Sequence, residues 1–265
     1  MSLQNLPGVA LITGAASGIG RGTAFAFAKS GCKRMLVGDV DENGLELTRK
    51  TILEDQPDVE VEVALVDISD EDSVQGFIDH CVSKFGRIDY ACNIAGICPA
   101  RESIAETSVE TFDRVISINT LGTFLCHRAE IRQMLKQDPL PTSRFKGSIV
   151  SVSSMAGINA SPGVTPYSSS KFAIIGQVKT DAMDYGPQGL RVNSVGPGFT
   201  NTERLRAMAN EEQLSAIAGS VPLSQLGLPE QVGQSMAWLC SEEAGYVNGI
   251  NMMVDGGATL WRQIS

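Results

Sequence analysis

The chain contains 265 residues, of which 43% are hydrophobic and 19% are charged, and this composition indicates a folded globular protein rather than a disordered one. Its formal net charge of −9 disfavours nucleic acids and anionic membrane surfaces as partners, because both attract clustered lysine and arginine. The sequence shows neither a secretory leader nor an apolar run of about 18 residues, so we expect a cytoplasmic protein.

Six cysteines are scattered without a CxxC pair, and neither of the two histidines, His80 and His127, stands near a cysteine at metal-ligand spacing. No metal site is therefore expected. Cysteines in apolar surroundings are typical of buried free thiols in a reducing compartment.

Short apolar runs alternate along the chain with stretches of helical periodicity. The predicted strands are 9–13, 34–38, 60–66, 88–92, 148–152, 191–195 and 251–254. The predicted helices are 18–30, 41–55, 70–85, 109–136, 165–185 and 229–241. Ser69 with Asp72 resembles a capping box at the third helix, and Pro229 suits the first turn of the last one.

Most of these strands are continuously apolar, as in a parallel sheet that is covered on both faces. The alternation predicts an α/β fold of the Rossmann type: a doubly wound, seven-stranded parallel sheet with helices on both faces, in a single domain over 1–265. The stretch 198–226 interrupts the pattern, and no strand is predicted within it. Because such sheets bind ligands beyond the carboxyl ends of their strands, we expect a substrate lid there.

The sequence TGAASGIG at 13–20 follows the first predicted strand and opens the first helix. Glycines permit a tight turn close to a pyrophosphate, and the helix N-terminus supplies N–H donors and positive potential. A glycine-rich turn without a ligand is the alternative, and the position directly after the first strand argues against it.

Asp39 ends the second predicted strand, 19 residues after Gly20. An acid at this place accepts hydrogen bonds from the adenosine ribose and repels a 2′-phosphate, so we predict NAD rather than NADP as the cofactor. Arg21, Lys33 and Arg34 are nearby cations, but none stands at that strand end.

The sequence YSSSK at 167–171 places Tyr167 and Lys171 on one face of a predicted helix. Ser154 stands thirteen residues before Tyr167, with Ser153 as its competitor. Asn119 interrupts a long apolar helix, where it either serves the site or only kinks the helix. A cation about 5 Å from a tyrosine would lower the phenol pKa by roughly two units, toward the range of a general base.

With the glycine-rich turn, these residues resemble the short-chain dehydrogenase/reductase family in its compact single-domain branch, over essentially the whole chain. The marks are TGAASGIG (13–20), Asp39, Asp67, NIAG (93–96), Asn119, Ser154, YSSSK (167–171), PGFTNT (197–202) and VDGG (254–257). The resemblance implies that Tyr167 is the general acid/base and that Ser154 holds the carbonyl oxygen. It further implies that Lys171 binds the nicotinamide ribose and activates Tyr167, and that Asn119 anchors a water in a proton relay.

The same resemblance implies the cofactor-binding residues. They are Gly14, Ser17, Gly18, Ile19, Gly20, Asp39, Asp67, Ile68, Asn93, Ala95, Gly96, Tyr167, Lys171, Pro197, Gly198, Thr200 and Thr202. The implied activity is the NAD-dependent interconversion of a secondary alcohol and a ketone. A homo-oligomer, a tetramer or a dimer, is implied through the fourth and fifth long helices and the last strand.

The chain departs from the family pattern at three places. The usual NNAG is NIAG, so Ile94 replaces an asparagine that stabilises the backbone. The stretch 137–145 lengthens the connection between Asn119 and Ser154, where we expect a surface loop. Thr200 stands where an aliphatic residue is common.

Two other functions stay open. An NADPH-dependent ketone or 3-oxoacyl reductase is disfavoured by Asp39, and enoyl reductases of the family space their tyrosine and lysine more widely than YSSSK. A non-catalytic dinucleotide-binding module is disfavoured by the presence of both Tyr167 and Lys171.

The lid residues bear on the substrate. The apolar residues of the lid indicate a hydrophobic alcohol such as a steroid, terpenoid or polyketide: Phe199, Leu205, Met208, Leu214, Ile217, Val221 and Leu223. The charged residues of the lid weaken that inference: Glu203, Arg204, Arg206, Glu211 and Glu212.

Four residues outside the motifs have open roles. Cys98 is expected to be an inert thiol in the pocket wall, and Asp181 and Asp184 are expected to be solvated. Trp261 either covers a neighbouring subunit's pocket or anchors the tail to the surface.

Overall fold

The computed structural model describes residues 5–260. Within them, seven strands form one parallel sheet in the order β3-β2-β1-β4-β5-β6-β7. Their bounds are β1 Val9–Thr13, β2 Arg34–Asp39, β3 Glu60–Leu65, β4 Tyr90–Asn93, β5 Gly147–Val152, β6 Leu190–Pro197 and β7 Asn251–Val254. The predicted seven-stranded parallel sheet is confirmed.

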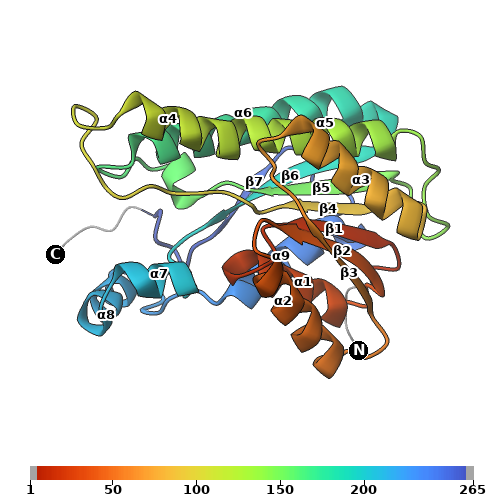
Figure 1. The fold of residues 1–265 in the computed structure, drawn as a ribbon, viewed down its shortest axis with the longest axis horizontal. Coiled ribbons are helices and arrows are strands. Elements are labelled where there is room, and N and C mark those ends of the chain that lie inside the picture. The colour runs from red at the N-terminus through yellow and green to blue at the C-terminus, as the bar shows by residue number, and fades with distance from the viewer. Residues whose placement is uncertain (1–4, 261–265) are drawn as a thin grey trace.

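Helices cover both faces of the sheet, as predicted, and Figure 1 shows the two layers. Above the sheet in that view lie α3 Glu71–Phe85, α4 Val109–Val115, α5 Gly122–Met134 and α6 Thr165–Tyr185; below it lie α1 Gly18–Lys29, α2 Glu42–Asp55 and α9 Pro229–Cys240. Successive side chains of a strand point to opposite faces, so Leu11 packs in the upper apolar cluster and Ile12 in the lower one.

The strand order reverses at β1, because β2 and β3 lie on one side of it and β4 to β7 on the other. Such a reversal leaves a crevice beyond the carboxyl ends of the two strands that meet there, β1 and β4. The glycine-rich turn follows β1, and the NIAG segment follows β4. The topology therefore brings these two sequence motifs to the same edge of the sheet.

The helix predicted over 109–136 is one helical run that changes its pitch in the middle. α4 continues into a π-helical turn, Ile116–Leu121, which continues into α5. Asn119 lies in this turn and is fully buried. Single π-helical turns interrupt the regular hydrogen-bond ladder and occur frequently at functional sites.

The start of α3 differs from the sequence prediction. Asp70, not Ser69, is the N-cap, and its carboxylate accepts from the backbone N–H of Ser73 at 2.7 Å. The Ser69 hydroxyl instead donates to Asp67 at 2.6 Å. The predicted capping box of Ser69 with Asp72 is therefore wrong, because the Ser69 hydroxyl is hydrogen-bonded to Asp67 and does not cap the helix.

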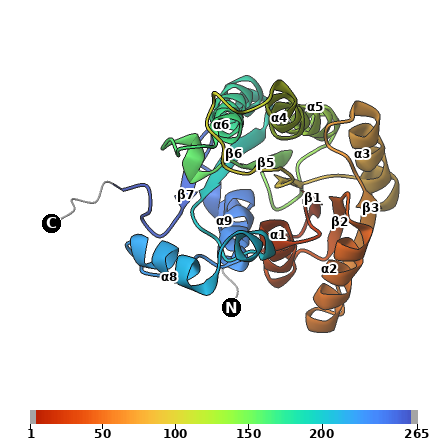
Figure 2. The ribbon, with the colours of Figure 1, turned by 60° about the vertical axis from the view of Figure 1, so that its left-hand side comes forward.

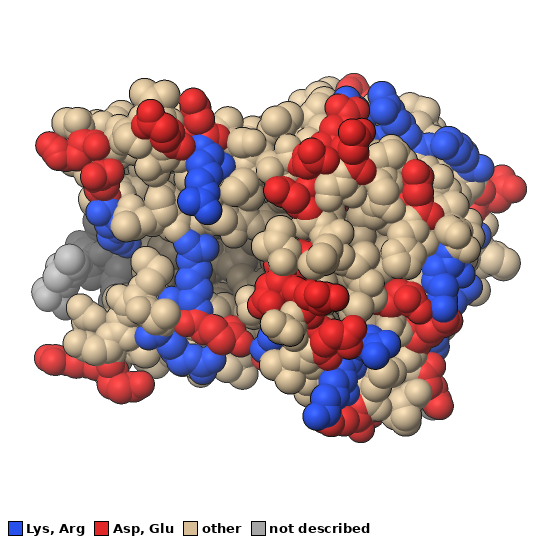
Figure 3. Space-filling view, viewed as in Figure 1, with Lys and Arg blue, Asp and Glu red and all other residues tan. Residues whose placement is uncertain are grey.

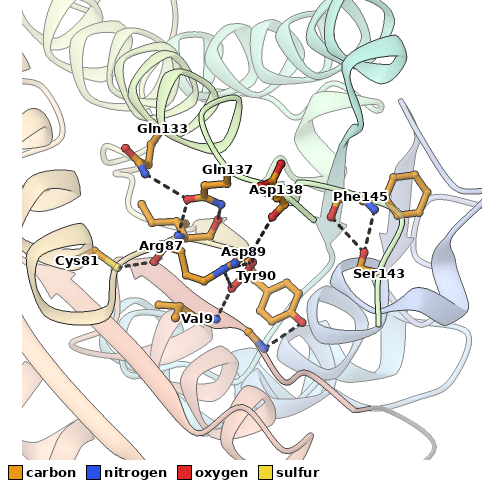
Figure 4. Close-up of polar contacts among 12 residues, drawn as sticks. Val9, Cys81, Arg87, Asp89, Tyr90, Gln133, Gln137, Asp138, Ser143 and Phe145 are labelled. Carbon is orange, nitrogen blue, oxygen red and sulfur yellow. Dashed lines mark hydrogen bonds and ion pairs between the residues drawn. The ribbon is translucent and has the colours of Figure 1, made fainter. Parts of the chain in front are cut away.

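The segment 137–145 is fastened to the edge of the sheet opposite the crevice, as the dashed contacts in Figure 4 show. Gln137 is 8% exposed, and its side chain donates to the carbonyl of Ile88 at 2.8 Å and accepts from the Ile88 N–H at 2.9 Å. Arg87 donates to the Asp138 carbonyl at 3.1 Å. The prediction of a surface loop is thus wrong at its first residue, because Gln137 pairs with the buried backbone just before β4.

Between β6 and β7 the chain leaves the sheet and forms α7 Glu203–Met208 and α8 Glu211–Ser220. Figure 2 shows α8 standing apart from the two layers. As predicted, this part of the described chain adds no strand, although an isolated bridge joins Thr200 to Gly227. α9 then begins with Pro229 in its first turn, also as predicted.

Within residues 5–260, no helix combines the length and the apolarity that crossing a membrane requires. All six cysteines are free thiols and five are buried, in agreement with the sequence analysis. Trp261 lies outside the described residues.

Candidate active site

A cavity of about 740 Å³ opens beyond the carboxyl ends of the strands. The predicted site residues that line it are Gly14, Ser17, Gly18, Ile19, Gly20, Asp39, Asp67, Ile68, Ala95, Gly96, Ser154, Tyr167, Lys171, Pro197, Gly198, Thr200 and Thr202. Cys98 also lines it, as expected. Residues from seven separate segments of the sequence therefore meet around one space.

The glycine-rich turn is shaped for close packing of backbone. Gly14 has a φ of +71°, in the left-handed region that favours glycine, and a Cβ on Gly20 would lie 1.9 Å from the Gly14 carbonyl oxygen. The N-cap Ser17 makes no side-chain capping bond, so its hydroxyl is available to a ligand. A pyrophosphate fits this cradle, because its glycines let the backbone come close and the N-terminus of α1 opens toward it.

An acid of the chain itself reaches this turn. Glu203, the first residue of α7, accepts from the Gly18 N–H at 3.2 Å and pairs with Arg21 at 3.1 Å. Arg21 also donates to Thr48 at 3.0 Å and to the carbonyl of Ala16. A carboxylate thus stands where the anion-binding character of a helix N-terminus is strongest.

Asp39 is held at the carboxyl end of β2. One of its oxygens accepts from the N–H of Val40 at 2.7 Å, and the other accepts from the N–H of Ala16 at 3.1 Å. The residue after Asp39 is Val40, which is uncharged and 71% exposed. No basic side chain therefore stands at this position to pair with a 2′-phosphate. Lys33 and Arg34 lie at the opposite end of the strand, about 16 Å away for five residues of extended chain.

Asp67 and Ile68 follow β3 and form the next part of the wall. Ser69 donates to Asp67 through its hydroxyl and its N–H, and these bonds hold the pKa of the Asp67 carboxyl below its usual value. Ile68 is 5% exposed and packs so closely on Gly122 that a Cβ there would lie 2.8 Å from it. The residue pair thus offers an anionic oxygen beside an apolar surface.

Tyr167, Lys171 and Ser154 form a compact group. The helix α6 carries the first two, with the Lys171 ammonium 5.6 Å from the centre of the Tyr167 ring. Lys171 is 4% exposed and donates to the carbonyl of Val152 at 2.8 Å. Ser154, which follows β5, is hydrogen-bonded to Tyr167 and also accepts from the N–H of Ala156 at 3.1 Å.

Ser153, the alternative candidate for the role of Ser154, forms other hydrogen bonds. Its hydroxyl donates to Asn251 at 2.5 Å and to the Val195 carbonyl at 3.1 Å. These contacts tie β5 to β6 and β7, whereas the hydroxyl of Ser154 faces Tyr167.

The acid–base character of the group corrects the sequence prediction. Burial raises the pKa of Tyr167, and the opposing effects of the Ser154 hydrogen bond and the Arg204 charge are smaller. Burial also lowers the pKa of Lys171 to about 8. Among the chain's own residues, desolvation of Tyr167 thus outweighs the effects that lower its pKa, contrary to the predicted net lowering.

Asn119 connects two of the segments that form the site through hydrogen bonds of its side chain. Its side chain accepts from the N–H of Ile97 at 2.8 Å, donates to the Ile97 carbonyl at 2.8 Å and donates to Ser170 at 3.0 Å. The NIAG segment is thereby fixed to α6 next to Lys171. Asn119 is thus more than a kink residue, although the side chain is used for positioning and does not line the cavity.

Asn93 points away from the cavity. Its amide donates to Glu130 of α5 at 2.9 Å, while its carbonyl oxygen is buried without a partner among the described residues. Glu130 is 1% exposed, and burial raises the pKa of its carboxyl. Asn93 therefore anchors the end of β4, and the sequence had no signal for its acidic partner.

A serine of β5, a histidine of α5 and an aspartate of α6 form a second buried group. His127 contacts Asp181 at 2.7 Å through Nδ1 and Ser151 at 2.6 Å through Nε2. Ser151 is fully buried within the sheet, so no substrate reaches it and a hydrolytic role is excluded. Asp181, expected to be solvated, is bound by His127 and keeps only 22% of its side chain exposed, whereas Asp184 is exposed as expected.

Several cavity residues were absent from the predicted site. They are Val40, Val66, Ile94, Ile97, Arg114, Ile118, Val152, Ser153, Phe199, Glu203, Arg204, Leu205 and Met208. Arg114 and Ile118 stand four apart on one helical face, a spacing that could have indicated them. Glu203 and Arg204 were named in the sequence analysis only as charges of the stretch 198–226, and no spacing indicated that they line the cavity.

The described residues contain no group of three or more histidine, cysteine, aspartate and glutamate side chains that could hold a metal ion.

Comparisons with known proteins agree with this geometry. A family model described as enoyl-(acyl carrier protein) reductase matches residues 14–259. The 3-oxoacyl-(acyl-carrier-protein) reductase FabG of Thermotoga maritima is 38% identical over 256 residues, covering 95% of this chain and 98% of that protein. The short-chain dehydrogenase srdC of Neurospora crassa is 36% identical over 272 residues, covering 97% and 98%.

Solved structures share the whole fold. A levodione reductase superposes with a TM-score of 0.91 at 30% identity, covering 98% of this chain and all of that one. A 3-ketoacyl-(acyl-carrier-protein) reductase from Brucella melitensis, complexed with NADH, gives 0.84 at 28% identity, covering 96% and 98%. From the nucleotide cradle, the Tyr–Lys–Ser group and these similarities, the chain belongs to the short-chain dehydrogenase/reductase family of oxidoreductases.

Proposed function

We propose that the protein is an NAD-dependent oxidoreductase that interconverts a secondary alcohol and a ketone, with Tyr167 as the proton-transfer group. The observation that carries the proposal is the contact of Tyr167 with Ser154 and Lys171 at the wall of the same cavity that holds the glycine-rich cradle. Members of the family use a nicotinamide dinucleotide, which supplies the hydride acceptor or donor when bound.

The proton chemistry follows from the group's geometry. In the direction of oxidation, the Ser154 hydroxyl orients the substrate oxygen and the Tyr167 oxygen removes its proton. The phenol needs a lower pKa for this step than burial alone gives it, and a protonated Lys171 favours the phenolate. In the direction of reduction, Tyr167 returns the proton to the carbonyl oxygen.

The proposed cofactor preference rests on Asp39. Its carboxylate is fixed at the end of β2 by three backbone N–H groups, and it would accept from the ribose hydroxyls of NAD. A 2′-phosphate would face the same charge. Arg21, the cation that could relieve this repulsion, is engaged by Glu203.

A 3-oxoacyl reductase that uses NADPH is the second candidate, and the identity to the Thermotoga maritima reductase favours it. The position of Asp39 argues against NADPH. The description of the family model names enoyl reductases, but the four-residue spacing of Tyr167 and Lys171 is narrower than those enzymes show.

The protein is proposed to assemble as a homo-oligomer, a dimer or a tetramer. Apolar side chains are exposed on the two long helical runs. They are Leu121 just before α5 (43%), Phe124 on α5 (44%), and Phe172 and Met183 on α6 (49% and 78%). Light scattering on the purified protein tests the assembly, and a monomer at micromolar concentration contradicts it.

The test of the function is Tyr167→Phe, measured by NADH formation across a panel of secondary alcohols. We expect NAD binding to persist and turnover to fall by a factor on the order of 10² or more, as when a general base is removed. Tyr185→Phe is the matched control, because Tyr185 ends the same helix and packs in the core away from the cavity. Near wild-type turnover in Tyr167→Phe refutes the assignment, and NAD binding without any turnover favours the non-catalytic module.

A further inference from the structure

Apart from Arg114 of α4, the charged side chains that line the cavity divide between its two ends. Asp39 and Asp67 follow β2 and β3, and Glu203 reaches the glycine-rich turn, so the acids belong to the dinucleotide end. Around Tyr167 the lining residues of the described chain include Lys171 and Arg204 but no carboxylate. In Figure 3, blue side chains border the dark hollow between the upper layer and the lid.

Arg204 reaches across the mouth of the cavity. It stands in the first turn of α7, and its guanidinium donates to the backbone carbonyl of Cys98, in the segment that follows β4. Its charge is close enough to lower the pKa of both Tyr167 and Lys171. The contact with Cys98 thus holds the guanidinium at the wall of the cavity that also contains Tyr167 and Lys171.

This guanidinium has unused binding capacity. Arginine carries five N–H donors in a planar fork. Within residues 5–260, the carbonyl of Cys98 is the one acceptor that Arg204 contacts, and no carboxylate forms an ion pair with it. Its neighbour Glu203 is turned the other way, toward Arg21 and Gly18.

Arg204 itself is exposed, but several residues that line the cavity near it are apolar. Phe199, Leu205 and Met208 line the cavity beside it, as do Ile94 and Ile97 on the opposite wall. A guanidinium bordered by apolar surface matches a planar oxyanion that binds in two-point fashion, and a carboxylate has this geometry. Arg204 is exposed at the mouth of the cavity, so a substrate that covers it displaces water from its guanidinium, and a carboxylate would replace the lost hydrogen bonds.

We infer that the substrate carries a carboxylate attached to an apolar body, and that Arg204 receives this carboxylate while Tyr167 serves the reacting oxygen. The inference rests on the proposed oxidoreduction of an alcohol or ketone and names the class of substrate. Arg204 is thus a specificity-determining residue.

The first experiment compares matched substrates. Reduction of 4-acetylbenzoate and of its methyl ester with NADH differs only in the charge at the distal group. We expect the wild type to favour the acid in kcat/KM by at least about tenfold, as for a charge-assisted hydrogen-bond pair. Arg204→Gln should abolish this preference, while Arg206→Gln should keep it, since Arg206 lies on the same helix but does not line the cavity.

A second experiment needs no turnover. Calorimetric titration of the NADH-saturated protein with benzoate and with benzamide should show tighter binding of benzoate by at least about tenfold. The difference should vanish in Arg204→Gln and persist in Arg206→Gln, with both variants retaining the wild-type thermal midpoint within a few degrees.

The outcomes separate the two proposals. Equal binding of benzoate and benzamide, or a benzoate preference that survives Arg204→Gln, overturns the role of Arg204. A preference for benzoate that depends on Arg204, combined with no turnover of any ketone, supports the carboxylate site and refutes the proposed oxidoreduction.

Discussion

The burial of Lys171 lowers the free energy of unfolding by an amount that can be measured. The side chain is 4% exposed, and burial lowers the pKa of its ammonium from 10.5 to about 8. At pH 7 the folded protein must hold this charge in a poorly solvated place, and the shift corresponds to about 3 kcal/mol at roughly 1.4 kcal/mol per pKa unit. The residue that assists Tyr167 therefore lowers the free energy of unfolding.

Lys171→Met should accordingly stabilise the protein at pH 7. The substitution also removes the hydrogen bond to the Val152 carbonyl, which contributes about 1 kcal/mol, so the net gain is about 2 kcal/mol. For a domain of this size the thermal midpoint should rise by roughly 4–8 °C.

The pH dependence has a definite sign. Because the folded-state pKa lies below the unfolded one, the unfolded chain binds more protons between pH 8 and pH 10.5. The penalty of Lys171 is therefore complete below pH 8 and disappears as the pH rises to 10.5. The gain of Lys171→Met should shrink over the same window and become a small loss at its upper end.

Thermal and urea unfolding of both proteins, without nucleotide and at several pH values, measure this difference. Lys179→Met is the matched control, because Lys179 is exposed on the same helix, and we expect its effect to stay within about 0.5 kcal/mol. The reasoning is refuted if Lys171→Met is no more stable than the wild type at pH 7, or if its gain is independent of pH.

Three further predictions follow from single contacts. Asp39→Ala combined with Val40→Arg should lower the NAD-over-NADP ratio of kcat/KM by a factor on the order of a hundred, and an unchanged ratio in parallel assays contradicts the role of Asp39. Glu203→Gln should tighten NADH binding by about two- to fivefold in a fluorescence titration, because an exposed ion pair competes only weakly for Gly18; weaker binding would show that Glu203 assists the nucleotide instead. Gln137→Ala should cost about 2–4 kcal/mol in urea unfolding, since it leaves both backbone groups of Ile88 unpaired, and a neutral effect would mean that water replaces the side chain.

The fold and much of the candidate site could be predicted from the sequence, because the relevant signals are local. Seven apolar runs alternate with stretches of helical periodicity, and this alternation predicts a parallel sheet with helices on both faces. The prediction does not depend on the order of the strands in the sheet. The turn at 13–20 and the pair Tyr167 and Lys171 are each encoded within eight residues, so backbone geometry alone places their members together. The thirteen-residue spacing to Tyr167 favoured Ser154 over Ser153, and resemblance to the family then supplied the roles of Ser154 and Asn119.

What the tertiary structure decided lies in contacts between distant segments. Asn93 meets Glu130, His127 meets Asp181, and Gln137 meets Ile88, and in each pair a buried polar group found its partner on another element. Sequence spacing carries no information about such pairs. A buried polar group that lacks a hydrogen-bond partner costs free energy, but which partner lies within reach depends on how the elements pack.

The same reason applies to the cavity. Whether Lys171 lowers the pKa of Tyr167 or burial raises it depends on how much solvent the assembled walls exclude. The direction in which Glu203 and Arg204 point depends on how α7 closes over two strands that are more than a hundred residues away. The sequence by itself determined which chemical groups are present at this edge of the sheet, while the tertiary structure determined their solvation and their partners, because desolvation and long-range contacts are properties of the packed chain.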